Sequence, residues 1–160
     1  MEKAIFALGC FWGSEAAFRA VPGVAEVASG YTGGHMANPT YREVCGDQTG
    51  HAEAVEVVYD PAQVSYRDLL QVFWDNHDPT TVNRQGPDVG TQYRSAIFYL
   101  TPEQAVAARE SKTALEAGGT LKRPVVTEIT AAGPFHRAEE YHQRYLEKHG
   151  MVACHVPSRQ

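Results

Sequence analysis

The sequence has few features that would place it outside the class of ordinary globular proteins. No apolar run in its 160 residues is long enough to cross a membrane, and the longest near the start covers only residues 4–8. Its 14 Lys and Arg residues are scattered and are outnumbered by 19 Asp and Glu residues, which argues against a nucleic-acid partner. Internal repeats and low-complexity segments are also absent. We therefore expect one globular domain spanning residues 1–160, with no nucleic-acid or membrane partner.

Cysteine is scarce, and its three positions, Cys10, Cys45 and Cys154, are far apart. An odd number with this spacing does not fit the disulfide framework of a small secreted domain. A zinc site is disfavoured, because the chain has no Cys-x-x-Cys pair and its seven histidines follow no standard ligand spacing. We therefore expect a cytoplasmic protein with no bound metal or cofactor. Two of the three cysteines could still form a transient catalytic disulfide.

The run Gly9-Cys10-Phe11-Trp12-Gly13 is the most informative part of the chain. Residues 3–8 are predicted to form a strand and residues 14–20 a helix, which places Cys10 between them. Unpaired N–H groups and the positive dipole end at the start of a helix favour a thiolate. A buried structural cysteine is the competing interpretation, and the local pattern alone does not decide between them.

The rest of the chain alternates between strand and helix patterns. Strands are predicted at residues 24–31, 52–59, 95–100 and 125–129, and helices at residues 66–76, after the Thr101 cap as far as Gly118, and at residues 138–143. Residues 35–50, which carry Tyr41 and Cys45, and residues 78–90 show no periodicity and are predicted to be loops. Neighbouring strands without a helix between them imply antiparallel pairing, so we expect a mixed sheet with helices mainly on one face.

Six segments, taken in order, resemble the A type of peptide methionine sulfoxide reductase over nearly the whole chain. They are residues 9–13 (GCFWG), 30–34 (GYTGG), 38–41 (NPTY), 50–55 (GHAEAV), 77–80 (HDPT) and 92–95 (QYRS). The resemblance implies an α+β fold: a ferredoxin-like two-layer α/β sandwich with a mixed, mainly antiparallel sheet and an irregular C-terminal tail at about residues 150–160. It also implies reduction of methionine-S-sulfoxide, free or in proteins, as repair after oxidative stress.

The resemblance also implies roles for individual residues. Cys10 would be the nucleophile and would become a sulfenic acid as methionine leaves. Glu53 would supply the proton, for which its carboxyl should be buried enough to hold a raised pKa. The hydroxyls of Tyr41 and Tyr93 would hold the sulfoxide oxygen, and Asp88 would help to orient the site.

Substrate binding and recycling involve further residues. By the same resemblance, Phe11 and Trp12 would form the apolar pocket for the S-methyl group of the substrate. Cys154 would be the resolving cysteine, and thioredoxin, or dithiothreitol in vitro, would reduce the Cys10–Cys154 disulfide. Cys45 matches a position without a required role. Many relatives carry two cysteines in the C-terminal tail, whereas this chain has one, which favours a one-step resolution in a monomer.

Two other functions compete with this interpretation. A thiol peroxidase or general disulfide oxidoreductase would also use a reactive cysteine, but the chain lacks Cys-x-x-Cys, and such an activity gives no reason for Tyr41, Tyr93 and Glu53 to converge. A ferredoxin-like binding domain without activity would bury Cys10. Labelling of Cys10 by iodoacetamide at neutral pH separates the reactive thiol from the inert one.

Overall fold

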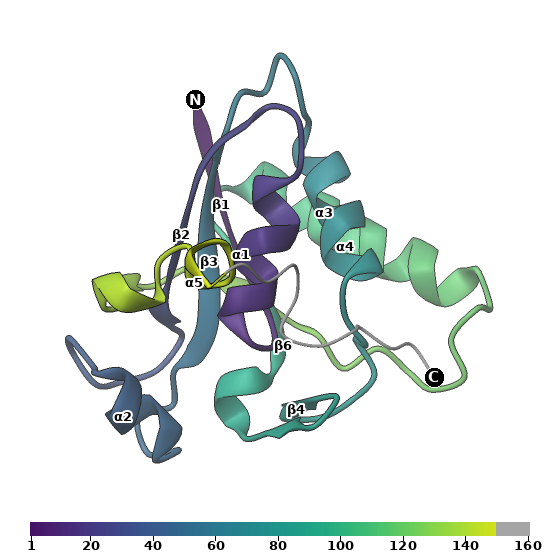
Figure 1. The fold of residues 1–160 in the computed structure, drawn as a ribbon. Helices are drawn as coiled ribbons and strands as arrows, with labels where there is room; N and C mark the ends of the chain where they lie inside the picture. The colour runs from purple at the N-terminus through teal and green to yellow at the C-terminus, as the bar shows by residue number, and fades with distance from the viewer. Residues whose placement is uncertain (150–160) are drawn as a thin grey trace.

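The computed structural model describes residues 1–149, and its centre is a six-stranded sheet in the order β7-β6-β1-β3-β2-β8 (Figure 1). The strands are β1 (Glu2–Leu8), β2 (Val24–Thr32), β3 (Ala52–Tyr59), β6 (Ser95–Tyr99), β7 (Glu128–Ala131) and β8 (His136–Arg137). All neighbours pair antiparallel except β6 and β7, which are parallel. The order β6-β1-β3-β2 interleaves two strand–helix–strand units, which is the ferredoxin-like arrangement. The tail expected at residues 150–160 lies outside the described residues.

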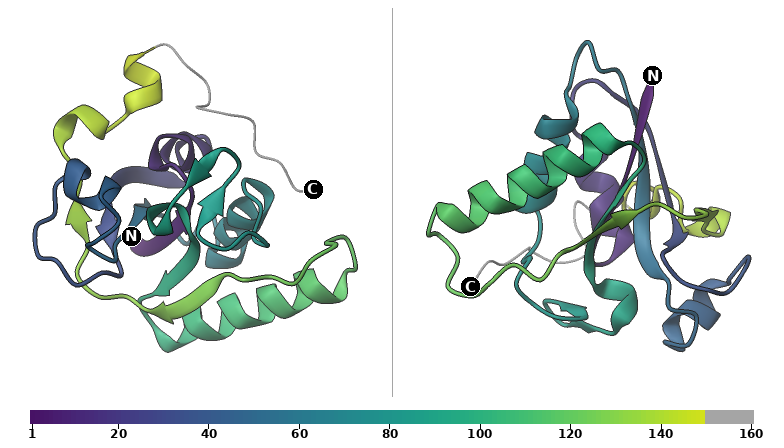
Figure 2. Two further views of the ribbon diagram at one scale, coloured as in Figure 1. Left: turned by 90° about the horizontal axis from the view of Figure 1, so that it is seen from below. Right: turned by 180° about the vertical axis from the view of Figure 1, so that it is seen from behind.

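Three helices, α1 (Phe11–Arg19), α3 (Tyr66–Asp75) and α4 (Pro102–Ala117), lie on the same side of this sheet (Figure 2). The alternation of β1 explains the packing, because residues 4, 6 and 8 join the main core while residues 5 and 7 join a smaller cluster. Phe6 stacks on Phe18 of α1 at 5.1 Å between ring centroids and lies 5.5 Å from Phe73 of α3. The expected mixed sheet with helices mainly on one face is therefore confirmed.

Residues 35–50, predicted to be a loop, contain the short helix α2 (Tyr41–Cys45). Thr40 and Glu43 hold its first turn in a capping box, because the Thr40 hydroxyl accepts the Glu43 N–H and the Glu43 carboxylate accepts the Thr40 N–H. Five residues are too few for a helical period to show in the sequence. Residues 78–90, also predicted to be a loop, contain a small hairpin of β4 (Arg84–Gln85) and β5 (Asp88–Val89), followed by the 3-10 helix η1 (Thr91–Tyr93).

Three predicted boundaries were wrong. Helix α1 begins at Phe11 rather than at residue 14, because Cys10 itself is its N-cap residue. The strand predicted at residues 125–129 lies at 128–131, since the Val126 N–H donates to the Pro79 carbonyl and pairing with β6 begins only at Glu128. Of the helix predicted at residues 138–143, only the 3-10 helix η2 (Glu140–His142) forms, between β8 and the short helix α5 (Tyr145–Lys148). Within residues 1–149, no helix has the length and apolar character needed to span a bilayer.

Candidate active site

Cys10 lies where β1 ends and α1 begins, as the sequence predicts. Gly9 makes the turn between the two elements with φ +100, a conformation that side chains other than glycine rarely adopt. The cysteine is partly exposed and serves as the N-cap residue of the nine-residue helix α1. Its carbonyl accepts the Ser14 hydroxyl at 3.1 Å. The positive dipole end of the helix at this point favours a negative charge on the sulfur.

Glu53 is buried beside this turn. It lies near the start of β3, opposite Tyr31 of β2, and only 1% of its surface is exposed. Its Oε1 accepts the N–H of Phe11, the residue after Cys10, at 3.2 Å. A carboxyl from the sheet thus satisfies the first N–H of α1, next to the thiol. The burial that a proton-donating role requires is present.

Tyr41 and Tyr93 are partly buried and interact electrostatically with the same carboxyl. The pKa of Tyr41 is raised, first by burial, then by donation of its hydroxyl to the sulfur of Cys45, and then by the charge of Glu53. The pKa of Tyr93 is raised, again first by burial, and then by the negative charges of Glu53, Cys45, Asp88 and Cys10. Both phenols therefore remain protonated hydrogen-bond donors at neutral pH.

Asp88 reaches the site from the β4–β5 hairpin. It is partly buried and pairs across the hairpin with Gln85. Its charge acts on Tyr93, which follows in η1. The structure thus brings together five predicted residues, namely Cys10, Tyr41, Glu53, Asp88 and Tyr93, from five different elements. Cys154 lies outside the described residues.

Phe11 and Trp12 follow Cys10 in the first turn of α1 and have different surroundings. The Phe11 ring is completely buried, with centroids 5.6 Å from Tyr31 and 5.1 Å from His142. The Trp12 ring is partly exposed and stacks on Tyr145 at 3.8 Å. Both aromatic side chains lie beside the cysteine, and their role as the methyl pocket stays a prediction.

Cys45 lies at the edge of this group, at the end of α2. The residue is exposed, but partial burial of its sulfur, followed by the charge of Glu53, raises its pKa. Hydrogen bonds from Tyr41 and Gln92 act in the opposite direction. Its expected lack of a catalytic role stays a prediction.

The segment before α5 supplies residues that the sequence analysis missed. The Glu139 carboxylate accepts the Tyr31 hydroxyl at 2.9 Å and the Tyr41 N–H at 3.0 Å. Burial would raise the pKa of Glu139, but these hydrogen bonds outweigh it and hold the pKa below its ordinary value. The carboxylate therefore ties α2, with Tyr41, to β2. Residues 138–143 were interpreted as one helical turn, and their mixture of carboxylate, phenol and imidazole side chains was the available signal.

His142 is the second missed residue. It is 1% exposed, and its Nδ1 accepts the Trp12 indole N–H at 3.0 Å. Because the indole can only donate, the neutral imidazole carries its proton on Nε2. Burial lowers the pKa of His142, and the Glu139 charge opposes this only in part. A neutral His142 therefore holds the indole of Trp12 next to the catalytic turn.

This lowered pKa predicts how acid affects stability. Below about pH 6.5 the unfolded chain binds a proton at His142 more readily than the folded protein does, so folding stability is lost as the pH falls toward the folded pKa. We expect His142→Gln to be less stable than the wild type by about 1–2 kcal/mol at pH 7.5, because a buried hydrogen bond is disturbed. This difference in the free energy of unfolding should narrow by pH 5, because the wild type loses stability as His142 is protonated and glutamine does not titrate. Urea unfolding at both pH values measures this difference. The control is His35→Gln, because His35 is exposed. A difference of constant size would contradict the assignment.

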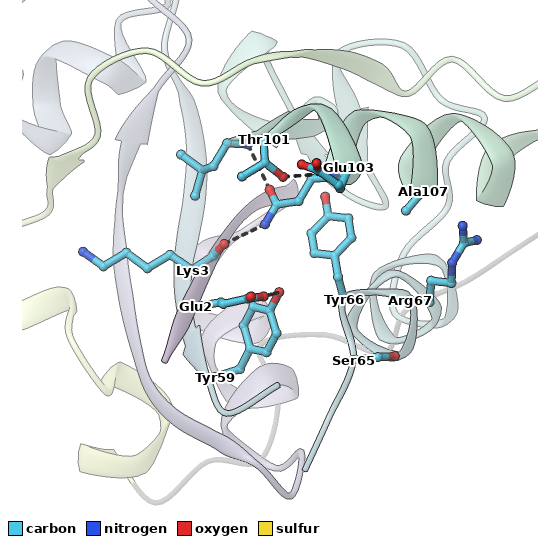
Figure 3. A pocket seen from close by; sticks show the side chains of 11 residues that line it. Glu2, Lys3, Tyr59, Ser65, Tyr66, Arg67, Thr101, Glu103 and Ala107 are labelled. Atoms are coloured by element: carbon cyan, nitrogen blue, oxygen red, sulfur yellow. Dashed lines mark hydrogen bonds between the residues drawn. The ribbon is translucent and has the colours of Figure 1, made fainter. Parts of the chain in front are cut away.

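A separate cavity lies at the other end of the sheet (Figure 3). Its volume is about 620 Å³, and its walls include Glu2 and Lys3 at the start of β1, Tyr66 of α3 and Gln104 of α4. Cys10 follows the opposite end of β1, and none of the predicted site residues lines this cavity. The cavity therefore takes no part in the chemistry around Cys10.

The fold is of the α+β class, and it places a partly exposed cysteine at a helix N-terminus beside a buried carboxyl and two phenols. The family model for peptide methionine sulfoxide reductase matches residues 2–160. The peptide methionine sulfoxide reductase MsrA of Methanoculleus marisnigri is 61% identical over 154 residues, which cover 96% of this chain and 94% of that protein. The chain therefore belongs to the peptide methionine sulfoxide reductase family, and it is an oxidoreductase that reduces methionine sulfoxide.

Solved structures agree with this assignment. Methionine sulfoxide reductase A of Corynebacterium diphtheriae superposes with a TM-score of 0.85 at 42% identity, covering 98% of this chain and 83% of that chain. Mxr1 from Saccharomyces cerevisiae in reduced form superposes with a TM-score of 0.87 at 32% identity, covering 98% of this chain and 92% of that chain. The α+β sandwich expected from the sequence is thus the fold of these reductases.

Proposed function

We propose that Cys10 is the nucleophile that reduces methionine-S-sulfoxide in this protein. Its thiolate attacks the sulfoxide sulfur and forms an S–S bond, and the oxygen takes up a proton. The S–S and S–O bonds then break as the hydroxyl group moves to the Cys10 sulfur. The oxygen ends on Cys10 as a sulfenic acid, and the sulfur of the substrate, reduced by two electrons, leaves as methionine. The observation that carries this proposal is the buried Glu53 carboxyl bonded at 3.2 Å to the N–H that follows Cys10.

Glu53 supplies the proton in this proposal, and the two phenols hold the oxygen. An S–O bond breaks more easily when its oxygen receives hydrogen bonds that strengthen as negative charge develops on it. Tyr41 and Tyr93 fit this role because each is a protonated donor that interacts electrostatically with Glu53. Asp88, next to Tyr93, orients the phenol and the bound substrate.

Phe11 and Trp12 form the apolar pocket for the S-methyl group in this proposal. The hydrogen bond from Trp12 to His142 and the stack on Tyr145 fix the indole, so that a ring of defined orientation borders the thiol. A rigid apolar wall selects a methyl sulfoxide over a charged or bulkier one.

Cys154 resolves the sulfenic acid in this proposal. Its thiol attacks the Cys10 sulfur, water leaves, and a Cys10–Cys154 disulfide forms. Tyr145, nine residues before Cys154 in the sequence, stacks on Trp12 in the first turn of α1, which brings the segment that precedes Cys154 close to the helix that follows Cys10.

Thioredoxin reduces this disulfide in the proposed cycle, and no bound cofactor takes part. Mxr1 from Saccharomyces cerevisiae has been crystallised in complex with Trx2, which supports a thioredoxin-type reductant for this chain. The three scattered cysteines fit a reducing compartment, so we place the protein in the cytoplasm. Residues 1–160 act as one domain and as a monomer in this proposal.

The experiment that tests the proposal supplies separated R and S epimers of free methionine sulfoxide to the reduced protein and measures the methionine formed. With dithiothreitol, we expect reduction of the S epimer only. With thioredoxin, the wild type and Cys45→Ser should turn over continuously, whereas Cys154→Ser should form about one equivalent of methionine and then stop. Reduction of neither epimer by the folded protein would overturn the proposed function. Sustained thioredoxin-driven turnover by Cys154→Ser would overturn only the resolving role.

A further inference from the structure

We propose that Gln85 is a positioning residue that holds the catalytic turn at Gly9 and Cys10 in register with Asp88 and Tyr93. This inference rests on the proposed role of Cys10. Gln85 has three kinds of contact. Its side chain bonds the backbone of Asp78 and packs on Gly9, and its backbone pairs with β5, the strand that carries Asp88.

The amide of Gln85 is fixed at both of its polar atoms. The residue is 4% exposed, its Oε1 accepts the Asp78 N–H at 2.7 Å, and its Nε2 donates to the Asp78 carbonyl at 2.8 Å. Asp78 is itself held, because its carboxylate accepts the Thr80 N–H at 2.9 Å and pairs with Arg123 at 3.2 Å. A side chain with both ends of its amide bonded in this way has one available position.

The aliphatic part of Gln85 lies against Gly9. A Cβ atom added to Gly9 would lie 2.8 Å from Cγ and 2.9 Å from Cβ of Gln85, which is closer than such atoms approach in real proteins. Glycine is thus required at position 9 for two reasons: the backbone has a positive φ, and the side chain of Gln85 leaves no room for a Cβ atom. Because Cys10 is the next residue, the backbone that carries the thiol rests on Gln85.

The same residue is part of the hairpin that leads to the other side of the site. Gln85 pairs with Asp88 across β4 and β5, and the Gly90 N–H closes the hairpin on the Asn83 carbonyl at 2.9 Å. The Tyr93 N–H then bonds the Gly90 carbonyl at 3.0 Å at the start of η1. A shift of Gln85 therefore displaces Cys10 relative to Asp88 and Tyr93. Misplacement of reacting groups by about 1 Å can cost about 100-fold in rate.

Gln104 makes the same kind of clamp away from the site and provides a matched control. It is 7% exposed, its Oε1 accepts the Leu100 N–H at 2.9 Å, and its Nε2 donates to the Lys3 carbonyl at 2.8 Å. Gln104 lines the cavity at the end of the sheet where β1 begins, far along β1 from Cys10. Gln104→Glu and Gln85→Glu thus make the same chemical change in the same kind of clamp.

The test compares these two variants with the wild type. In Gln85→Glu at pH 8, the new carboxylate cannot donate to the Asp78 carbonyl and is repelled by it. We expect kcat for the S epimer to fall about 10- to 100-fold with a smaller change in KM. We expect the ratio of variant to wild-type kcat to recover toward pH 5.5, where the protonated carboxyl can donate again. We also expect the pH midpoint of Cys10 alkylation by iodoacetamide to rise, because a negative charge is added near the thiol. Asp78, Asp88 and Glu53 are present in both proteins, so the comparison isolates the introduced group.

Gln104→Glu should lower the melting temperature to a similar degree while leaving kcat and the alkylation midpoint at wild-type values. A Gln85→Glu protein that matches Gln104→Glu in kcat and in midpoint would overturn the inference. If Gln85→Glu does not fold, Gln85→Met keeps the aliphatic stem on Gly9 and removes both hydrogen bonds. A wild-type kcat for Gln85→Met would then overturn the inference. The alkylation of Cys10 is measured without substrate, so this readout stands even if the proposed function fails.

Discussion

Replacing Cys10 by serine should abolish reduction of both epimers, with a loss of at least about 10⁴-fold in single-turnover methionine formation. A serine hydroxyl stays protonated at neutral pH and cannot replace the thiolate, even at the start of α1. The hydroxyl of Ser14 donates to the backbone carbonyl of residue 10, so this hydrogen bond does not depend on the side chain that is replaced. The fold should therefore survive, and circular dichroism can check this.

Cys45→Ser is the matched control for this experiment, because Cys45 lies beside the same tyrosines but is not assigned a catalytic role. It should keep at least about half of the wild-type rate. Iodoacetamide labelling adds an independent measurement, since rapid labelling at neutral pH should disappear in Cys10→Ser and persist in Cys45→Ser. Methionine formation by folded Cys10→Ser at more than a few per cent of the wild-type rate would rule out Cys10 as the nucleophile.

Glu53→Gln should slow the chemical step by about 10²- to 10³-fold and leave substrate binding nearly unchanged. Glutamine has the same shape and keeps an oxygen that can accept the Phe11 N–H, so the turn should persist. It cannot transfer a proton to the sulfoxide oxygen. Single-turnover rates measured over a series of substrate concentrations separate the rate of the chemical step from binding.

Glu56→Gln is the control for the proton donor. Glu56 is on the same strand, three residues further along, and lies near Lys3 rather than near the site. Its substitution should leave the single-turnover rate unchanged. An equal single-turnover rate for Glu53→Gln and the wild type would remove Glu53 from the proton-donor role.

The parts of the fold that were predicted well are elements that lie in the central sheet or pack against it. The patterns of residues 52–59 and 66–76 predicted β3 and α3 to within one residue. The buried residues of α3 recur at helical spacing, whereas the first four residues of β3 are all buried. Helix α2 was missed because a capping box and the contact of its first N–H with Glu139 stabilise it, and neither has a period.

In the site, too, some features follow from a local sequence pattern and others depend on contacts between distant residues. The position of Cys10 at a turn between a strand and a helix could be predicted from its neighbours, whereas its role as nucleophile came from the resemblance. The resemblance supplied Glu53, Tyr41, Tyr93 and Asp88, and the structure brings them together. Glu139 and His142 could not be found, because their function lies in contacts with residues about 100 or more positions away, Tyr41 and Trp12. A short segment without an apolar stripe gives no indication of such partners.

The hydrogen bond between Trp12 and His142 joins residues 130 positions apart, and this separation has a consequence for synthesis of the protein. A chain is made from its N-terminus, so Cys10 and Trp12 emerge from the ribosome long before residues 139–142. The imidazole that fixes the indole, and the Glu139 carboxylate that ties Tyr41 to β2, are made much later. The thiol therefore exists while most of the segment up to residue 142 is still being made, and the contacts that fix Trp12 and Tyr41 form only after that segment is complete.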